Sequence, residues 1–121
     1  MRIIKDWLSV PCAWCRKTID FMNYHHYGYP NLQISGVKSN VLNILGINIT
    51  AQQVKSLCSN FIAITSDLLK DEIYVFVSPP NKELSEDCIG VVFSCSEECK
   101  DYFDLYVMNL IHDKLRKDRL P

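Results

Sequence analysis

The sequence predicts an α+β fold in a single domain, residues 1–121, and three observations support this prediction. Two runs rich in β-branched and aromatic residues, 73–77 and 89–93, are typical of paired strands. The stretch from about Ser96 to Arg116 has the apolar periodicity of a long helix. Two close pairs of cysteines lie near opposite ends of the chain. Because a domain of this length buries only a modest core, a metal that joins the two ends would add to its stability.

The N-terminal part of the chain carries little periodicity. A single helical turn is expected within residues 2–10, before Pro11. Residues 20–35 combine aromatic and polar side chains with Gly28 and Pro30, which predicts an irregular, partly packed loop.

Two helices are predicted in the middle of the chain. Apolar residues recur at helical spacing within 36–46, and Gly46 can supply the left-handed residue that commonly follows a helix. Thr50 and Gln53 match a capping box, in which each side chain satisfies a backbone N–H of the other residue. A broad apolar face then predicts a helix that continues to Leu69.

The last third of the chain predicts a β-hairpin followed by a helix. Strands 73–77 and 89–93 are joined by a polar connection, 81–87. Ser96 offers a helix cap, and acidic residues fill the first turn, where negative charge suits the helix dipole. Basic residues follow Lys114, which is the favourable sign for a C-terminal end.

Four cysteines have the spacing of a metal site. Cys12 and Cys15 bracket a tight turn, whereas Cys95 and Cys99 straddle the start of the last helix. Free backbone N–H groups and the dipole at a helix start favour thiolate over thiol. Four thiolates make the closed, structural arrangement of Zn²⁺, with no coordination position open to substrate. The sequence therefore predicts one structural zinc ion per chain.

Other interpretations of the cysteines stay open. An even number of cysteines is compatible with disulfides, and a CxxC sequence is compatible with a redox pair. The redox interpretation requires a βαβ context, which the pattern does not supply. The remaining two cysteines, Cys58 and Cys88, lie in apolar stretches typical of small core residues.

The segments CAWCRKTI and VFSCSEECKDYF together resemble the TRASH-like treble-clef zinc fingers, a group that includes MYM-type and ribosomal types. The second half of those fingers typically reads Phe-Cys-Ser-x-x-Cys, then a basic residue and a phenylalanine. Here Ser94 is inserted between Phe93 and Cys95, and Arg16 stands where the group usually has glycine. The two halves are also separated by all of 16–94, a much longer segment than is usual in the group.

The resemblance implies a knuckle, a β-hairpin and a long C-terminal helix around one zinc ion. The halves of the finger would be about 10–20 and 72–118, with a loop and helices inserted at about 20–70. Its zinc ligands would be the four paired cysteines: Cys12, Cys15, Cys95 and Cys99. The resemblance implies a structural role, often with protein or nucleic-acid contact, and no single activity.

Charge and composition limit the functional classes. A net charge of -1 and a pI near 6.3 argue against charge-driven binding to nucleic acid or anionic membrane. No apolar run approaches a bilayer span. Lys5 and Asp6 stand where a signal peptide would need its apolar region, so a cytoplasmic, non-secreted protein is expected.

Three functional hypotheses follow from these features. The leading one is a non-enzymatic, zinc-stabilised accessory protein that binds another protein through its inserted helices or aromatic loop. The second is a nucleic-acid-binding finger that uses the tyrosine loop and the basic end of the last helix. The third is an HNH-like nuclease that depends on two adjacent histidines. The candidate partner-binding residues are Trp14, Tyr24, His25, His26, Tyr27, Tyr29, Arg116 and Lys117.

Overall fold

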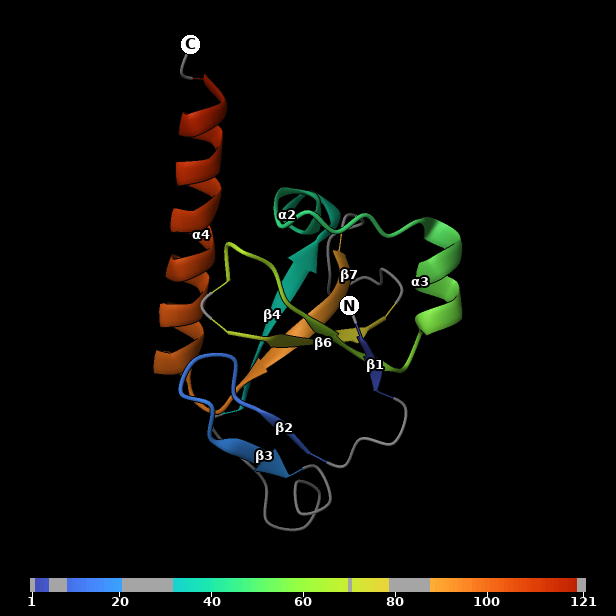
Figure 1. The fold of residues 1–121 in the computed structure, drawn as a ribbon. Coiled ribbons are helices and arrows are strands. Elements are labelled where there is room, and N and C mark those ends of the chain that lie inside the picture. The colour runs from blue at the N-terminus through green and yellow to red at the C-terminus, as the bar shows by residue number, and fades with distance from the viewer. Residues whose placement is uncertain (1, 5–8, 21–31, 70, 79–87, 120–121) are drawn as a thin grey trace.

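A five-stranded antiparallel sheet, a separate two-stranded hairpin and a long C-terminal helix make up the fold (Figure 1). The computed structural model describes residues 2–4, 9–20, 32–69, 71–78 and 88–119. In chain order the elements are β1 (Arg2–Ile4), β2 (Ser9–Pro11), β3 (Thr18–Asp20), β4 (Gln33–Lys38), α2 (Ser39–Ile44), α3 (Ala51–Leu57), β5 (Phe61–Ile64), β6 (Ile73–Val77), β7 (Cys88–Ser94) and α4 (Glu97–Arg119). The order of strands in the large sheet is β1-β5-β6-β7-β4, and β2 pairs with β3.

The predicted hairpin and last helix are confirmed. Strands β6 and β7 pair antiparallel, with Val77 opposite Gly90. A Cβ atom at Gly90 would lie 2.3 Å from the backbone oxygen of Phe76, so only glycine permits this close approach. Ser96 precedes α4, and its Oγ accepts from the Cys99 backbone N–H at 3.2 Å.

The main core lies between one face of the sheet and the helices α4, α2 and α3, with Leu42 and Leu57 supplied by the two short helices. Phe103 and Val107 of α4 pack onto apolar side chains of the strands. The opposite face carries a smaller aromatic cluster, in which Phe61 lies 5.2 Å from Phe76 and 6.0 Å from Phe93 between ring centroids. The sheet is therefore buried in part on both faces.

The predicted helix from Thr50 to Leu69 is wrong in its second half. Its start is confirmed, because Thr50 and Gln53 form the complete capping box. The helix α3 ends at Leu57, and all four residues of Phe61–Ile64 are buried in strand β5 between β1 and β6. A short apolar run that is buried on both faces lacks strand alternation, so its pattern resembles that of a buried helix.

Three further predictions need correction. Within 36–46 only Ser39–Ile44 is helical and the first residues belong to β4, although Gly46 does follow the helix with a φ of 83°. In 2–10 the described residues form strands rather than a helical turn, since β1 pairs with β5 and β2 with β3. In 20–35, residues 33–35 belong to β4, whereas 21–31 lie outside the described residues.

The two remaining cysteines differ from each other. Cys88 is buried in β7, as predicted for a core residue. Cys58 is only half-buried at the end of α3, because the predicted helix stops there. None of the helices in the described ranges combines the length and the apolar character needed to cross a membrane.

Candidate metal centre

The first pair of cysteines lies in the turn of the β2–β3 hairpin. The turn is closed by a bond from the Cys12 backbone N–H to the oxygen of Lys17, at 2.8 Å. The next residue, Ala13, donates its backbone N–H to the oxygen of Phe93 at 3.0 Å. This second bond attaches the small hairpin to the end of β7, which leads directly to Cys95.

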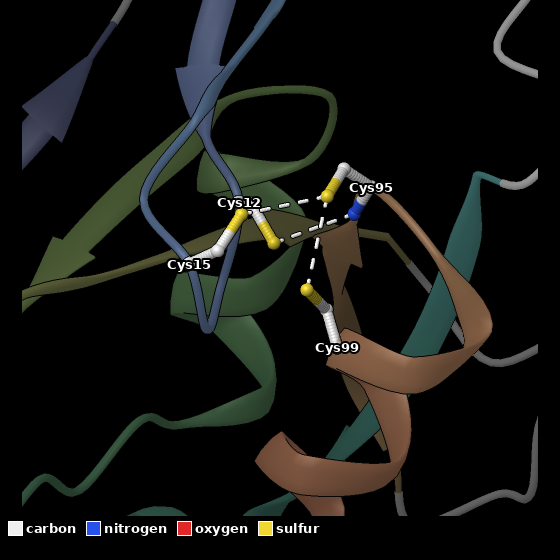
Figure 2. Close-up of side chains that lie close together, drawn as sticks. All are labelled: Cys12, Cys15, Cys95 and Cys99. Atoms are coloured by element: carbon white, nitrogen blue, oxygen red, sulfur yellow. Dashed lines mark hydrogen bonds between the residues drawn. The ribbon is translucent and has the colours of Figure 1, made fainter.

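The second pair lies where β7 passes into α4. Cys95 falls between the strand and the helix, and Cys99 is the third residue of the helix. The Ser96 cap holds the Cys99 backbone at the first turn. Residues four apart across a helix start can point the same way, so both sulfurs face the hairpin turn (Figure 2).

The four sulfurs converge on one centre, as Figure 2 shows. The Sγ atoms of Cys12, Cys15, Cys95 and Cys99 all lie within 4.8 Å of one another. Two of these separations are 3.5 Å, between Cys15 and Cys95, and 3.8 Å, between Cys95 and Cys99. Tetrahedral Zn²⁺ with Zn–S bonds of about 2.3 Å requires S···S separations of about 3.8 Å. The cluster could therefore hold a metal ion, and its donor set fits Zn²⁺.

Backbone groups favour negative charge on Cys12. Burial of this thiol opposes ionisation, but its sulfur accepts backbone N–H bonds from Cys95 and Trp14, at 3.4 and 3.5 Å. The pKa of Cys12 is lowered to about 7 as the net result. Such N–H···S bonds are the outer contacts that orient a thiolate ligand and stabilise its charge.

Cys95 has the opposite tendency. Burial raises the pKa of Cys95 to about 12, with further contributions from bonds to Cys15, Cys12 and Cys99 and from the negative charge on Cys12. Thiolates this close together repel one another, so a second negative charge is unfavourable without a cation. A divalent ion at the centre would remove this repulsion and deprotonate the coordinating thiols.

The residue that follows Cys15 has a strained backbone conformation. Arg16 has a φ of 68°, in the left-handed region that favours glycine. This is the position at which TRASH-like fingers usually carry glycine. The Arg16 side chain instead forms an ion pair with Asp71, with 3.3 Å between Nε and Oδ2.

An aromatic surface and a cavity adjoin the cysteine cluster. The Trp14 side chain is 37% exposed and stacks on Tyr102 of α4, with ring centroids 5.6 Å apart. Tyr106 meets the same indole edge-on at 6.0 Å. Beside these rings lies a cavity of about 300 Å³ lined by Ala13, Trp14, Arg16, Leu69, Asp71, Ile73, Phe103 and Tyr106.

The sequence did not predict the tyrosine side of this surface. Tyr102 lies on α4 and is 48% exposed. It lies one helical turn after Cys99, and this spacing is a signal that could have placed it beside the metal centre. Leu69 and Ile73 reach the cavity only through the tertiary fold, so no local pattern could have predicted them.

The other candidate partner-binding residues fall into two groups. Arg116 and Lys117 are exposed near the C-terminal end of α4, far along the helix from the cysteines (Figure 1). The tyrosines and histidines of the aromatic loop lie outside the described residues: Tyr24, His25, His26, Tyr27 and Tyr29. Among the exposed large apolar side chains of the described ranges, none lies on α3, whereas four lie on α4.

Comparison with known proteins adds no family assignment. No family model matches the chain, and no significant match was found among curated proteins or among solved structures.

Proposed function

We propose that this chain is a small, non-enzymatic accessory protein that binds another protein and is stabilised by one zinc ion. The observation that supports this most strongly is the convergence of four cysteine sulfurs from two distant segments. In the proposed arrangement, β2–β3 is the knuckle, β6–β7 the hairpin and α4 the helix of a treble-clef-like finger.

The composition of the site favours a structural role for the metal. Four thiolates complete a tetrahedral shell, so no position is left for a water or a substrate. The ion would join the hairpin turn to the start of α4, and the free energy of binding would contribute directly to folding. Reaction chemistry at the ion would require the loss of a ligand.

The aromatic surface beside the site favours a protein partner. Aromatic side chains are enriched in protein interfaces and supply much of the binding energy there. Trp14 stands between two of the proposed ligands, so zinc would fix the indole next to Tyr102 and the cavity. We expect an apolar side chain of the partner to enter this cavity. The paired charges of Arg16 and Asp71 would lie beside it.

A metal assay combined with a capture experiment tests this proposal. Elemental analysis should find about one zinc ion per chain, and zinc-loaded protein should capture a partner protein from its native host. Nuclease treatment should leave this partner bound, whereas its loss on nuclease treatment would favour the nucleic-acid hypothesis. Capture by His25→Ala and His26→Ala variants should be unchanged.

Matched variants locate the binding surface. Trp14→Ala should keep the zinc and lose the partner, because the indole is partly exposed beside the ligands. Ile3→Ala serves as the control, since Ile3 is an exposed apolar residue on the edge strand β1. Absence of zinc, with the cysteines paired as disulfides, would disprove the finger. Equal capture by both variants would disprove the role of Trp14.

A further inference from the structure

The outward face of α4 carries a stripe of three apolar residues and one histidine that the core does not use. Leu105, Met108, His112 and Leu115 follow one another at spacings of three, four and three residues, and all four are exposed. Met108 has 55% of its surface exposed. The core-facing residues of the helix, such as Phe103, lie on the opposite side. A helix that is apolar on two opposite faces has one face left for a partner.

The position of the helix makes this stripe accessible. Figure 1 shows that the C-terminal half of α4 extends well beyond the sheet. The stripe runs from Leu105 to Leu115, a length of about 15 Å at the rise of an α-helix. Alternating steps of three and four residues are also the spacing of an apolar seam between two helices.

The charges along α4 are distributed unequally. Residues 97–104 contain four acidic residues and one lysine. Residues 113–117 contain three basic residues and one aspartate. Asp101 lies near the acidic end of the stripe and Arg116 near its basic end, and both are exposed. The outward face therefore has an acidic residue, Asp101, near one end and a basic residue, Arg116, near the other.

We propose that this outward face of α4 binds the same face of a second copy of the chain in antiparallel orientation. A two-fold interface requires a self-complementary surface, and an acidic–apolar–basic stripe meets this requirement. With the two-fold axis near residue 110, Leu105 packs on the partner copy's Leu115 and Met108 on its His112. Asp101, close to the midline of the stripe, then lies near the partner copy's Arg116.

The charge pattern selects this orientation. A parallel pair would place acidic end on acidic end and basic end on basic end, and like charges across an interface are unfavourable. The antiparallel pair joins opposite charges and also aligns the two helix dipoles favourably. Because three apolar residues and one histidine bury less than a standard interface, the dimer is weak, with a Kd on the order of 10–100 µM.

This inference goes beyond the proposed function and does not depend on it. The stripe contains none of the four cysteines, and Trp14 belongs to a different surface. Zinc content and partner capture report on the proposed function, whereas sedimentation of the purified protein reports on self-association. One proposal can therefore fail while the other holds.

Analytical ultracentrifugation of the zinc-loaded protein over a range of about 5–500 µM tests the dimer. The mass should rise from monomer to dimer, and the rise should weaken with added salt. Met108→Glu should weaken association at least tenfold. Gln52→Glu is the matched control, because it adds the same charge at an exposed position on α3 and should leave the dimer unchanged.

A charge exchange tests the antiparallel orientation. The Asp101→Arg variant should be monomeric when it is alone, and so should the Arg116→Glu variant. Each substitution brings like charges together at both ends of the dimer. Their equimolar mixture should associate again. A wild-type chain that stays monomeric up to about 500 µM, or a dimer that Met108→Glu leaves intact, would overturn the proposal. Failure of the mixture to associate would overturn the antiparallel orientation. A monomeric chain whose stripe binds a different protein would show that the occupant of this face is not a second copy of the chain.

Discussion

The large sheet and the cysteine end of the molecule are held together by different physical means. In the sheet, Ile62, Ile64 and Val75 are fully buried, and burial of their apolar surface supplies the stability. At the cysteine end, β2 and β3 have only three residues each. A two-stranded hairpin of that length is at best marginally stable in water.

The large sheet and the cysteine end should therefore respond differently to the same treatments. The hairpin is joined to the sheet by the backbone bond from Ala13 to Phe93, by burial of Val10 and Ile19 and by the convergence of the cysteines. Removal of the metal should therefore act first on the hairpin turn and the start of α4. Damage to strand packing should act first on the sheet. Variants that destabilise only one of these two regions test whether the regions are independent.

The largest effect is expected from removal of a metal ligand. Cys99→Ser should abolish zinc binding and unfold the hairpin turn and the start of α4, with aggregation as a consequence, because structural zinc contributes on the order of 10 kcal/mol of apparent binding free energy. Cys12→Ser should act in the same way. Urea denaturation and elemental analysis of each variant, with and without a chelator, measure the effect.

The two remaining cysteines provide the control for this experiment. Cys58→Ala should cost only about 1 kcal/mol of the free energy of unfolding, as is usual for a half-buried side chain. Its zinc content should be unchanged. Equal losses for Cys58→Ala and Cys99→Ser would contradict the division into four ligands and two packing residues.

A smaller effect, confined to the sheet, is expected for Gly90→Ala. The new Cβ would meet the Phe76 oxygen at 2.3 Å, so the paired strands β6 and β7 must shift. We expect a loss of about 3 kcal/mol in the free energy of unfolding, the upper range for an overpacked site. Zinc stoichiometry should remain at one ion per chain. Loss of the metal as well would show that the two regions are not independent.

Local signals in the sequence predicted one part of the fold well. The capping box at Thr50, the strand that includes Tyr74 and the cap at Ser96 all depend on neighbouring residues, and all three are present. The two cysteine pairs could also be recognised from the sequence, because each pair has the spacing of metal ligands. Their convergence within 4.8 Å agrees with that prediction.

The parts that were wrong depend on distant partners. Strand β5 pairs with β1 and β6, so its burial on both faces could not be deduced from its own run of apolar residues. Strand β4 likewise becomes a strand through its pairing with β7, more than fifty residues later. The cavity beside Trp14 combines the hairpin turn, β6 and α4, so its lining is a property of the tertiary fold.

The smallest expected effect comes from backbone strain at Arg16. A left-handed conformation costs a residue with a Cβ about 1 kcal/mol, whereas glycine adopts it freely. Arg16→Gly and Arg16→Ala both delete the ion pair with Asp71, so they differ only in the backbone. The glycine variant should be the more stable by about 1 kcal/mol, the reverse of the usual order of these two residues. Urea denaturation of the zinc-loaded variants measures this difference.

Ser59 allows the same comparison at the sheet, because it precedes β5 with a φ of 68°. Ser59→Gly should likewise be more stable than Ser59→Ala by about 1 kcal/mol, whether or not zinc is bound. The stability difference between Arg16→Gly and Arg16→Ala should disappear when a chelator removes the metal. Without the metal the hairpin turn no longer has to adopt the left-handed conformation, so glycine gains nothing there. A difference at Arg16 that persists without zinc would mean that the β2–β3 pairing, the Ala13 bond and the buried side chains of the hairpin keep the turn in shape without the metal. The metal would then bind to a preformed site rather than create it.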